Sequence, residues 1–294
     1  YNGKGSFRDF FLENSYGQLD IETTVTRWVT LSKGHAYYGR DDDAHAYEAL
    51  TEAIDLLDGE INFKDFDNDN DGIVDGISII HQGQGEEFTG SDENNIWSHS
   101  WSLGSALYPA NPPKKDGVYI NSYTIQPEIK AGKGNTAMST IGVICHEFGH
   151  NLGAPDYYDT SDNGTNNGTG QWDLMPAGSW NGNSGDRPAH VNAYQKSEYG
   201  WLTLKELPNS ESFVLKPVVD EPEVYKINTA TDGEFFVLEN RQQKGVFDSA
   251  LPGSGMIIYH VDENSIRLNY SQNEVNVGLH QGLYPIVASG TMRN

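Results

Sequence analysis

Apolar residues recur at helical spacing in three segments of the chain. The first helix is predicted after the acidic run at 41–43 and ends before Gly59, a residue suited to a helix stop. The second is predicted at 139–152, with Ser139 as its N-cap and Gly153 as its terminator. The third is predicted to begin near Pro188 and to end at Gly200.

Shorter runs with alternating or continuous apolar residues predict strands, separated by Gly, Pro and Asp turns. They occupy 77–80, 118–125, 213–218, 224–227, 235–238 and 256–259. Helices beside a mixed sheet predict an α+β fold. We expect one domain at 1–204 and a β-rich C-terminal region at 205–294, packed on that domain or continuous with it.

The composition narrows the classes of partner. The chain has 294 residues, with 42 acidic and 19 basic side chains and a formal net charge of −23. This charge opposes binding to nucleic acid or anionic lipid and suits divalent cations and an extracellular protein. The single cysteine, Cys145, cannot form an internal disulfide, and no apolar run approaches the roughly 20 residues of a membrane span.

The second predicted helix carries the strongest chemical signal. His146 and His150 stand four residues apart, so both imidazoles can reach one zinc ion from the same helix face. Glu147 lies between them and can take a proton from a water that the metal has acidified. The alternative is a chance match in which both histidines only decorate a helix.

A third zinc ligand is expected after the helix. Gly153 allows a left-handed turn, and Asp156, ten residues after His146, can then fold back towards the metal. Asp159 is the alternative ligand, or it binds calcium instead. A second cation site among Asp159, Asp162, Asn163 and Asp173 is a weaker hypothesis.

A second acidic segment predicts a structural calcium site. Asp67, Asp69, Asp71 and Asp75, with the backbone carbonyl of Ile73, follow the spacing of a calcium loop of the EF-hand type, with Gly72 at the bend. Ser78 stands where such a loop has a bidentate Glu, so other ligands must complete the site. The alternative is a solvated acidic turn.

The residues from His146 to Asp156 resemble the extended motif of metzincin-type peptidases, with Asp in place of the usual third His. More narrowly, the chain resembles the secreted bacterial metallopeptidases of the immune inhibitor A family. Further matching segments are Asn14–Gln18, Ile96–His99, Trp172–Met175, Glu198–Trp201 and Gly255–Asp262.

This resemblance implies a zincin-like catalytic domain at 1–204, zinc for catalysis, calcium for stability and usually a preceding pro-segment. It also implies that Met175 forms a tight turn beneath the metal, although a lone Met is more often core filler. Pro176 departs from the small residues that commonly follow this Met.

We therefore expect a secreted or cell-surface bacterial zinc endopeptidase, monomeric, acting on extracellular proteins or peptides with Glu147 as general base. One alternative is a calcium-stabilised surface-binding module with a vestigial zinc site; another is hydrolysis of a non-peptide amide. His99, between Trp97 and Trp101, is a candidate for an edge strand that pairs with substrate, and simple packing of aromatic side chains is the alternative. Candidates for an oxyanion-binding group are His190, Tyr194, Tyr157 and Tyr158.

Overall fold

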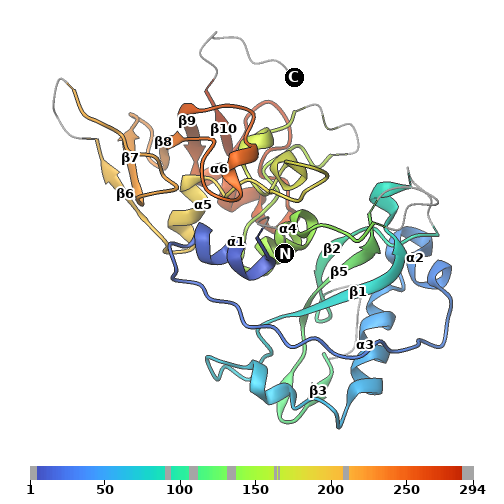
Figure 1. Ribbon diagram of the computed structural model, residues 1–294. Helices are drawn as coiled ribbons and strands as arrows, with labels where there is room; N and C mark the ends of the chain where they lie inside the picture. Colours follow the sequence, from blue (N-terminus) through green and yellow to red (C-terminus); the bar gives the residue numbers. More distant parts are fainter. Residues whose placement is uncertain are drawn as a thin grey trace. The chain divides into compact units, whose positions relative to one another are not determined.

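The computed structural model describes residues 5–89, 94–105, 112–130, 137–161, 164, 166–207 and 212–286. The chain forms two compact units (Figure 1): the middle unit, residues 23–151, and the split unit, residues 1–22 with 152–294. Helices and strands occur together, which confirms the α+β class. The expected boundary at residue 204 stays a prediction, because compactness does not test which residues catalysis needs.

The middle unit is built on a three-stranded sheet with the order β1-β5-β2. β1 (Ile77–Gln84) runs parallel to β5 (Ser122–Ile129), and β2 (His99–Ser102) pairs with β5 antiparallel. The helices are α2 (His35–Asp43), α3 (Ala46–Leu57) and α4 (Ile141–Asn151), and η1 (Phe63–Phe66) and η2 (Glu86–Phe88) are 3-10 turns. The predicted strand at 118–125 is wrong as one element: it divides into β4 (Val118–Tyr119), which pairs with β3 (Lys114–Lys115), and β5.

Successive side chains of β1 and β5 point to opposite faces of the sheet, so each face packs against a different layer. Tyr123 and Ile125 join a buried apolar cluster that includes Leu50 and Ile54 of α3. The other face of the sheet is polar and carries α4: the hydroxyl of Ser100 on β2 donates to Asn151 Oδ1 of α4 at 2.9 Å. The sheet therefore separates α3 from α4.

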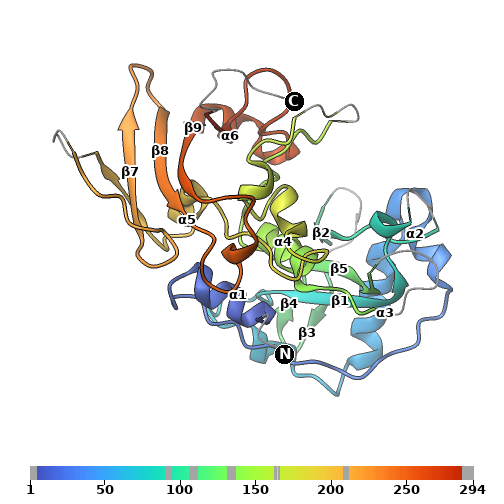
Figure 2. The same ribbon diagram turned by 45° about the horizontal axis from the view of Figure 1, so that its top comes forward.

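The split unit contains a five-stranded sheet with the order β10-β9-β8-β7-β6. Its strands are β6 (Thr203–Glu206), β7 (Glu223–Asn228), β8 (Glu234–Arg241), β9 (Gly255–Asp262) and β10 (Leu283–Pro285). All neighbours are antiparallel except β6 and β7. Figure 2 shows β7, β8 and β9 side by side.

Short helices complete the split unit. They are α1 (Phe7–Asn14), α5 (Ala193–Glu198), α6 (Glu263–Asn269) and the 3-10 turns η3 (Gly170–Trp172), η4 (Ala177–Trp180), η5 (Asp248–Ala250) and η6 (Tyr270–Gln272). The helix predicted from Pro188 begins only at Ala193, because the Asn192 side chain caps it by accepting from the amide of Gln195 at 2.8 Å. None of the helices within the described ranges is long and apolar enough to cross a membrane.

The strand predicted at 213–218 is not formed. Pro217 makes only an isolated bridge with Asn240, whose side chain donates to the carbonyl of Leu215 at 2.8 Å. A proline cannot donate a ladder hydrogen bond, and this segment runs alongside β8 without joining the sheet as a strand.

Ionised side chains fill the centre of the split unit. Arg241 is fully buried and donates to Asp248 at 2.7 and 3.0 Å and to Glu239 at 3.2 Å, and both carboxylates are also fully buried. Lys196 and His190 lie in the same cluster, 3.4 Å apart. Burial lowers the pKa of Lys196 to about 8, and neighbouring Arg241 adds to this effect.

Candidate metal centre

The predicted zinc motif lies on α4, where the structure brings three donor side chains together. The ligand atoms of His146, Glu147 and His150 all lie within 4.8 Å of one another. The two imidazole rings are nearly perpendicular, with centroids 4.9 Å apart. One helical turn therefore sets both imidazoles and the carboxylate around a common point, as the spacing predicts.

The two histidines of this group are accessible from solvent, as a metal site that receives substrate requires. Both histidines are partly exposed, whereas Glu147 is buried, with 6 % of its surface exposed. Two imidazoles that solvent partly reaches match the donors that zinc takes in catalytic sites. The chemistry and mutual distances of the donor atoms thus fit a zinc ion.

Packing fixes the helix that carries the motif. Cys145, next to the first histidine, is fully buried, and burial raises the pKa of its thiol well above the usual value. A thiol with this burial is a packed core side chain. After the helix, Gly153 adopts a φ of +95°, the left-handed conformation expected from the sequence.

The candidates for the third ligand lie beyond α4, in the split unit. Asp156 is 6 % exposed; its amide donates to Asn273 Oδ1 at 2.8 Å, and its Oδ2 accepts from Asn273 Nδ2 at 2.7 Å. Asp159 instead accepts from the amide and hydroxyl of Ser161 at 3.1 and 2.7 Å. The paired contact with Asn273 orients Asp156 in a way that sequence reasoning missed, because the two residues lie 117 positions apart.

The segment around Met175 is buried. Met175 is fully buried, and so is Asp173, which accepts from the Thr169 hydroxyl and from the Asn192 amide nitrogens. Burial raises the pKa of Asp173 although these hydrogen bonds oppose the shift. Asp173 thus stabilises a buried turn through its hydrogen bonds. Two other residues of the hypothetical second cation site, Asp162 and Asn163, lie outside the described residues.

The predicted calcium loop brings three carboxylates together. Oxygen atoms of Asp67, Asp69 and Asp71 lie within 4.8 Å of one another. The backbone amides of Asp71, Gly72 and Ile73 donate to these carboxylates at distances from 2.8 to 3.2 Å. The loop is therefore curled around its acidic side chains.

The end of the calcium loop is arranged differently from its start. Asp75 accepts from the side chain of Asn68 and does not belong to the group of three carboxylates. Ile73 forms a bridge with Tyr119, which ties this end of the loop to β4.

His99 lies on β2, an edge strand of the three-stranded sheet within the described ranges. Its Nδ1 lies 2.8 Å from the carbonyl of Trp97, and its Nε2 lies 3.1 Å from the hydroxyl of Tyr123. Burial lowers the pKa of this imidazole. Both ring nitrogens thus lie close to neighbouring oxygen atoms, which fits packing, while the strand itself stays at the edge.

The oxyanion candidates His190 and Tyr157 prove to be interior residues. His190 is fully buried and lies 3.1 Å from Glu13, and Tyr157, 1 % exposed, donates to Gln195 at 2.6 Å. Tyr194 is 4 % exposed. Glu147 is buried to a similar degree, so burial does not exclude an oxyanion role, and these three candidates stay predictions.

Comparison with known proteins gives consistent matches. The family model described as immune inhibitor A peptidase M6, catalytic domain, matches residues 2–202. The pre-pro-metalloprotease PrtV of Vibrio cholerae serotype O1 (strain ATCC 39315 / El Tor Inaba N16961) is 30% identical over 256 residues, which cover 77% of this chain and 27% of PrtV.

A second similar protein is immune inhibitor A of Bacillus thuringiensis subsp. alesti. It is 30% identical over 222 residues, which cover 65% of this chain and 31% of the relative. The chain thus matches about a quarter to a third of the length of these two relatives.

Proposed function

Because the chain belongs to the immune inhibitor A family of M6 peptidases, we propose that it is a zinc-dependent endopeptidase. The observation that carries the proposal is the group of donor atoms from His146, Glu147 and His150 within 4.8 Å on α4. His146 and His150 hold the zinc, Asp156 supplies the third ligand with Asp159 as the alternative, and Met175 lies in the turn beneath the site.

Glu147 acts as the general base. A zinc ion held by His146 and His150 would polarise the scissile carbonyl and lower the pKa of a water towards about 7. The Glu147 carboxylate takes the proton of the attacking water and passes it to the departing amine.

The substrate is an extended segment of an extracellular protein or peptide. The side of β2 that no described strand pairs with offers main-chain hydrogen-bonding groups to such a segment, in the manner of an added strand. The zincin-like catalytic domain is assigned to 1–204, with 205–294 as the β-rich C-terminal region, and the protein functions as a secreted or cell-surface bacterial monomer.

Calcium has a structural role in this proposal. The carboxylates of Asp67, Asp69 and Asp71 repel one another, and a hard cation bound between them removes this repulsion. The carbonyl of Ile73 and the carboxylate of Asp75 complete the ligand set once Asp75 turns from Asn68 to the ion.

Replacement of Glu147 tests the assignment. Glu147→Ala is expected to retain zinc and to lose about 10²–10⁴-fold in the rate of casein cleavage, since only the proton acceptor is removed. His150→Ala should lose both zinc and activity. Asp42→Asn, a change at an exposed acid, is the control and should keep both.

Casein cleavage by Glu147→Ala at the wild-type rate would overturn the proposal. The alternative of a calcium-stabilised binding module with a vestigial zinc site predicts no cleavage by the wild-type protein, with or without a zinc chelator. A vestigial site would also have no use for the buried carboxylate of Glu147.

A further inference from the structure

One end of the five-stranded sheet gathers a second group of metal-binding side chains. The ligand atoms of Glu234, Asp262 and His280 all lie within 4.8 Å of one another. Glu234 begins β8 and Asp262 ends β9, and the antiparallel register places the two residues directly opposite each other. His280 belongs to the segment that leads into β10.

The backbone holds these three positions independently of their side chains. The amide of Asp262 donates to the carbonyl of Gly282 at 2.8 Å, and the amide of Gly282 donates to the carbonyl of Val275 at 2.8 Å. The Asn276 side chain also exchanges two hydrogen bonds with the backbone of Leu283. The His280 segment is thus fixed beside β9 before any ion binds.

A cation would reduce the repulsion between the carboxylates of Glu234 and Asp262. Like charges directly opposite each other on neighbouring strands are destabilising. Among the described residues, no lysine or arginine forms an ion pair with Glu234 or Asp262, and nearby Arg267 pairs with Glu263 at 2.7 Å.

The donor side chains of His280 and Glu234 remain accessible for coordination, whereas that of Asp262 is only 9% exposed. Asp262 uses Oδ1 to cap α6, accepting from the amides of Asn264 and Ser265 at 2.9 and 3.1 Å, which leaves Oδ2 directed at His280 Nε2 at 2.7 Å. The His280 side chain is 65% exposed and that of Glu234 is 24% exposed. An ion can therefore enter from solvent.

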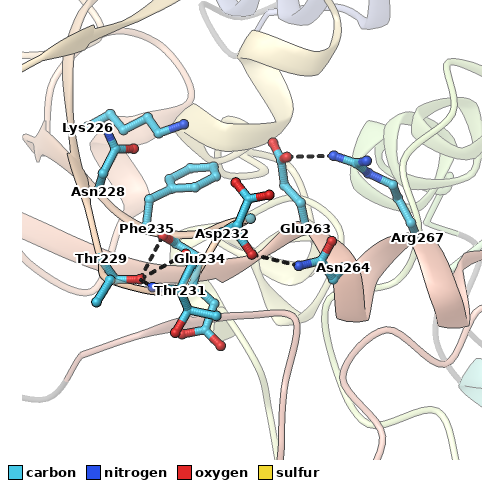
Figure 3. Close-up of a pocket in the computed structure, with 12 residues that line it drawn as sticks. Lys226, Asn228, Thr229, Thr231, Asp232, Glu234, Phe235, Glu263, Asn264 and Arg267 are labelled. Carbon is cyan, nitrogen blue, oxygen red and sulfur yellow. Dashed lines mark hydrogen bonds and ion pairs between the residues drawn. The ribbon is translucent and has the colours of Figure 1, made fainter.

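Room for water ligands lies next to the group. Glu234 lines a cavity of about 440 Å³ formed by the β7–β8 turn and the start of α6 (Figure 3). A metal held by three protein side chains completes its coordination with water, so an open neighbouring space is an advantage.

His260 adds a fourth donor close by. It lies on the same face of β9 as Asp262, two residues earlier, and its Nε2 is 3.7 Å from Glu234 Oε2. Its Nδ1 is buried and has no hydrogen-bond partner among the described residues. An imidazole beside the carboxylates reinforces a preference for borderline metals over calcium, which takes oxygen ligands.

We propose that Glu234, Asp262 and His280 bind a divalent transition-metal ion of the zinc class. The ion joins β8, β9 and the segment before β10, and so stabilises this end of the sheet. Two zinc ligands at tetrahedral angles stand roughly 3.4 Å apart. Only a small movement of the exposed His280 ring from its present 2.7 Å contact admits the ion.

Calorimetric titration with zinc tests the site in the full chain. The protein is first loaded with one equivalent of zinc in excess calcium, which occupies the α4 motif and the Asp67 loop, and is then titrated with Zn²⁺. We expect one further binding event. His280→Ala and Glu234→Gln should each weaken it at least tenfold.

Asp232→Asn is the matched control, because it removes a carboxylate that lines the same cavity but stands outside the group of three. This variant should keep the further event unchanged, and metal analysis after dialysis should count one zinc fewer in His280→Ala than in Asp232→Asn. The proposal is wrong if the wild-type protein takes up no further zinc, or if His280→Ala binds it as tightly as the wild type.

Discussion

Arg241 carries a guanidinium group into the interior of the split unit, where Asp248 and Glu239 neutralise it. Burial alone would raise the pKa of Asp248, but Arg241 outweighs it and lowers that pKa to about 2. Breaking a buried ion pair by removing one partner leaves a charge without compensation, which is more costly than never forming the pair. The arginine and its carboxylates therefore act as one unit.

Asp248→Asn is expected to lower the free energy of unfolding by about 3–5 kcal/mol, because it leaves Arg241 buried with half of its charge partners. Urea unfolding measures this loss. Asp220→Asn, which breaks an exposed pair with Lys244, should cost at most about 1 kcal/mol. Equal effects of the two substitutions would contradict the assigned role of the buried pair.

The same carboxylate predicts a pH dependence. The pKa of Asp248 is lower in the folded protein than in the unfolded chain, so its contribution is complete above the unfolded value of about 3.9. This contribution of roughly 2 kcal/mol is lost as the pH falls from about 4 to 2. Unfolding curves of the wild type should show the loss, and those of Asp248→Asn should lack it.

Single residues divide into those that the sequence could predict and those that it could not. The positions of His146, Glu147 and His150 follow from one helical turn, so spacing alone was sufficient. The contact of Asp156 with Asn273 and the pair of Arg241 with Asp248 depend on how distant segments meet. No local pattern encodes such contacts.

At the scale of elements, periodicity predicted α3 and α4 to within about two residues at each end and located the two long strands β8 and β9. The periodicity of apolar residues gave wrong elements where single side chains decide the backbone conformation. Asn192 delays the start of α5, and Pro217 keeps its segment from forming a strand. Propensity is a weak prior that such local contacts change.

The acidic loop before β1 provides a prediction for one element. Saturating calcium should raise the melting temperature of the wild type by about 5–10 °C, because an ion bound only by the folded loop stabilises it by mass action. Asp69→Asn with Asp71→Asn should abolish most of this shift. Asp41→Asn with Asp42→Asn, an equal change of charge at two other exposed positions, should retain it.

Scanning calorimetry with and without calcium measures these shifts. If calcium raises the melting temperature of the double variant as much as that of the wild type, calcium binds elsewhere. The loop is then the solvated acidic turn that its composition also allows.

At the scale of the molecule, residues of the split unit that precede residue 202 form hydrogen bonds with residues that follow residue 212. Tyr16 donates to the carbonyl of Val218 at 2.8 Å, and Arg241 donates to that of Trp172 at 2.7 Å. The match to the family model ends at residue 202, although buried partners of the matched residues come later in the chain. Residues 212–286 are thus part of the fold that supports the earlier segment.

Truncation after residue 204 is therefore expected to prevent folding of the split unit. It removes β7 to β10 and leaves the buried Lys196 and His190 without their ionic surroundings. Circular dichroism and solubility of the truncated chain measure the effect against the full chain. A soluble truncated protein that unfolds cooperatively would show that 1–204 is an independent domain.

The central claim, that His146 and His150 hold a zinc ion beside Glu147, is tested most directly by anomalous diffraction at the zinc edge from crystals grown with zinc. The account predicts one peak about 2.1 Å from an imidazole nitrogen of each histidine and within reach of Asp156. Imidazole rings that point apart, with no peak between them in crystals saturated with zinc, would contradict it.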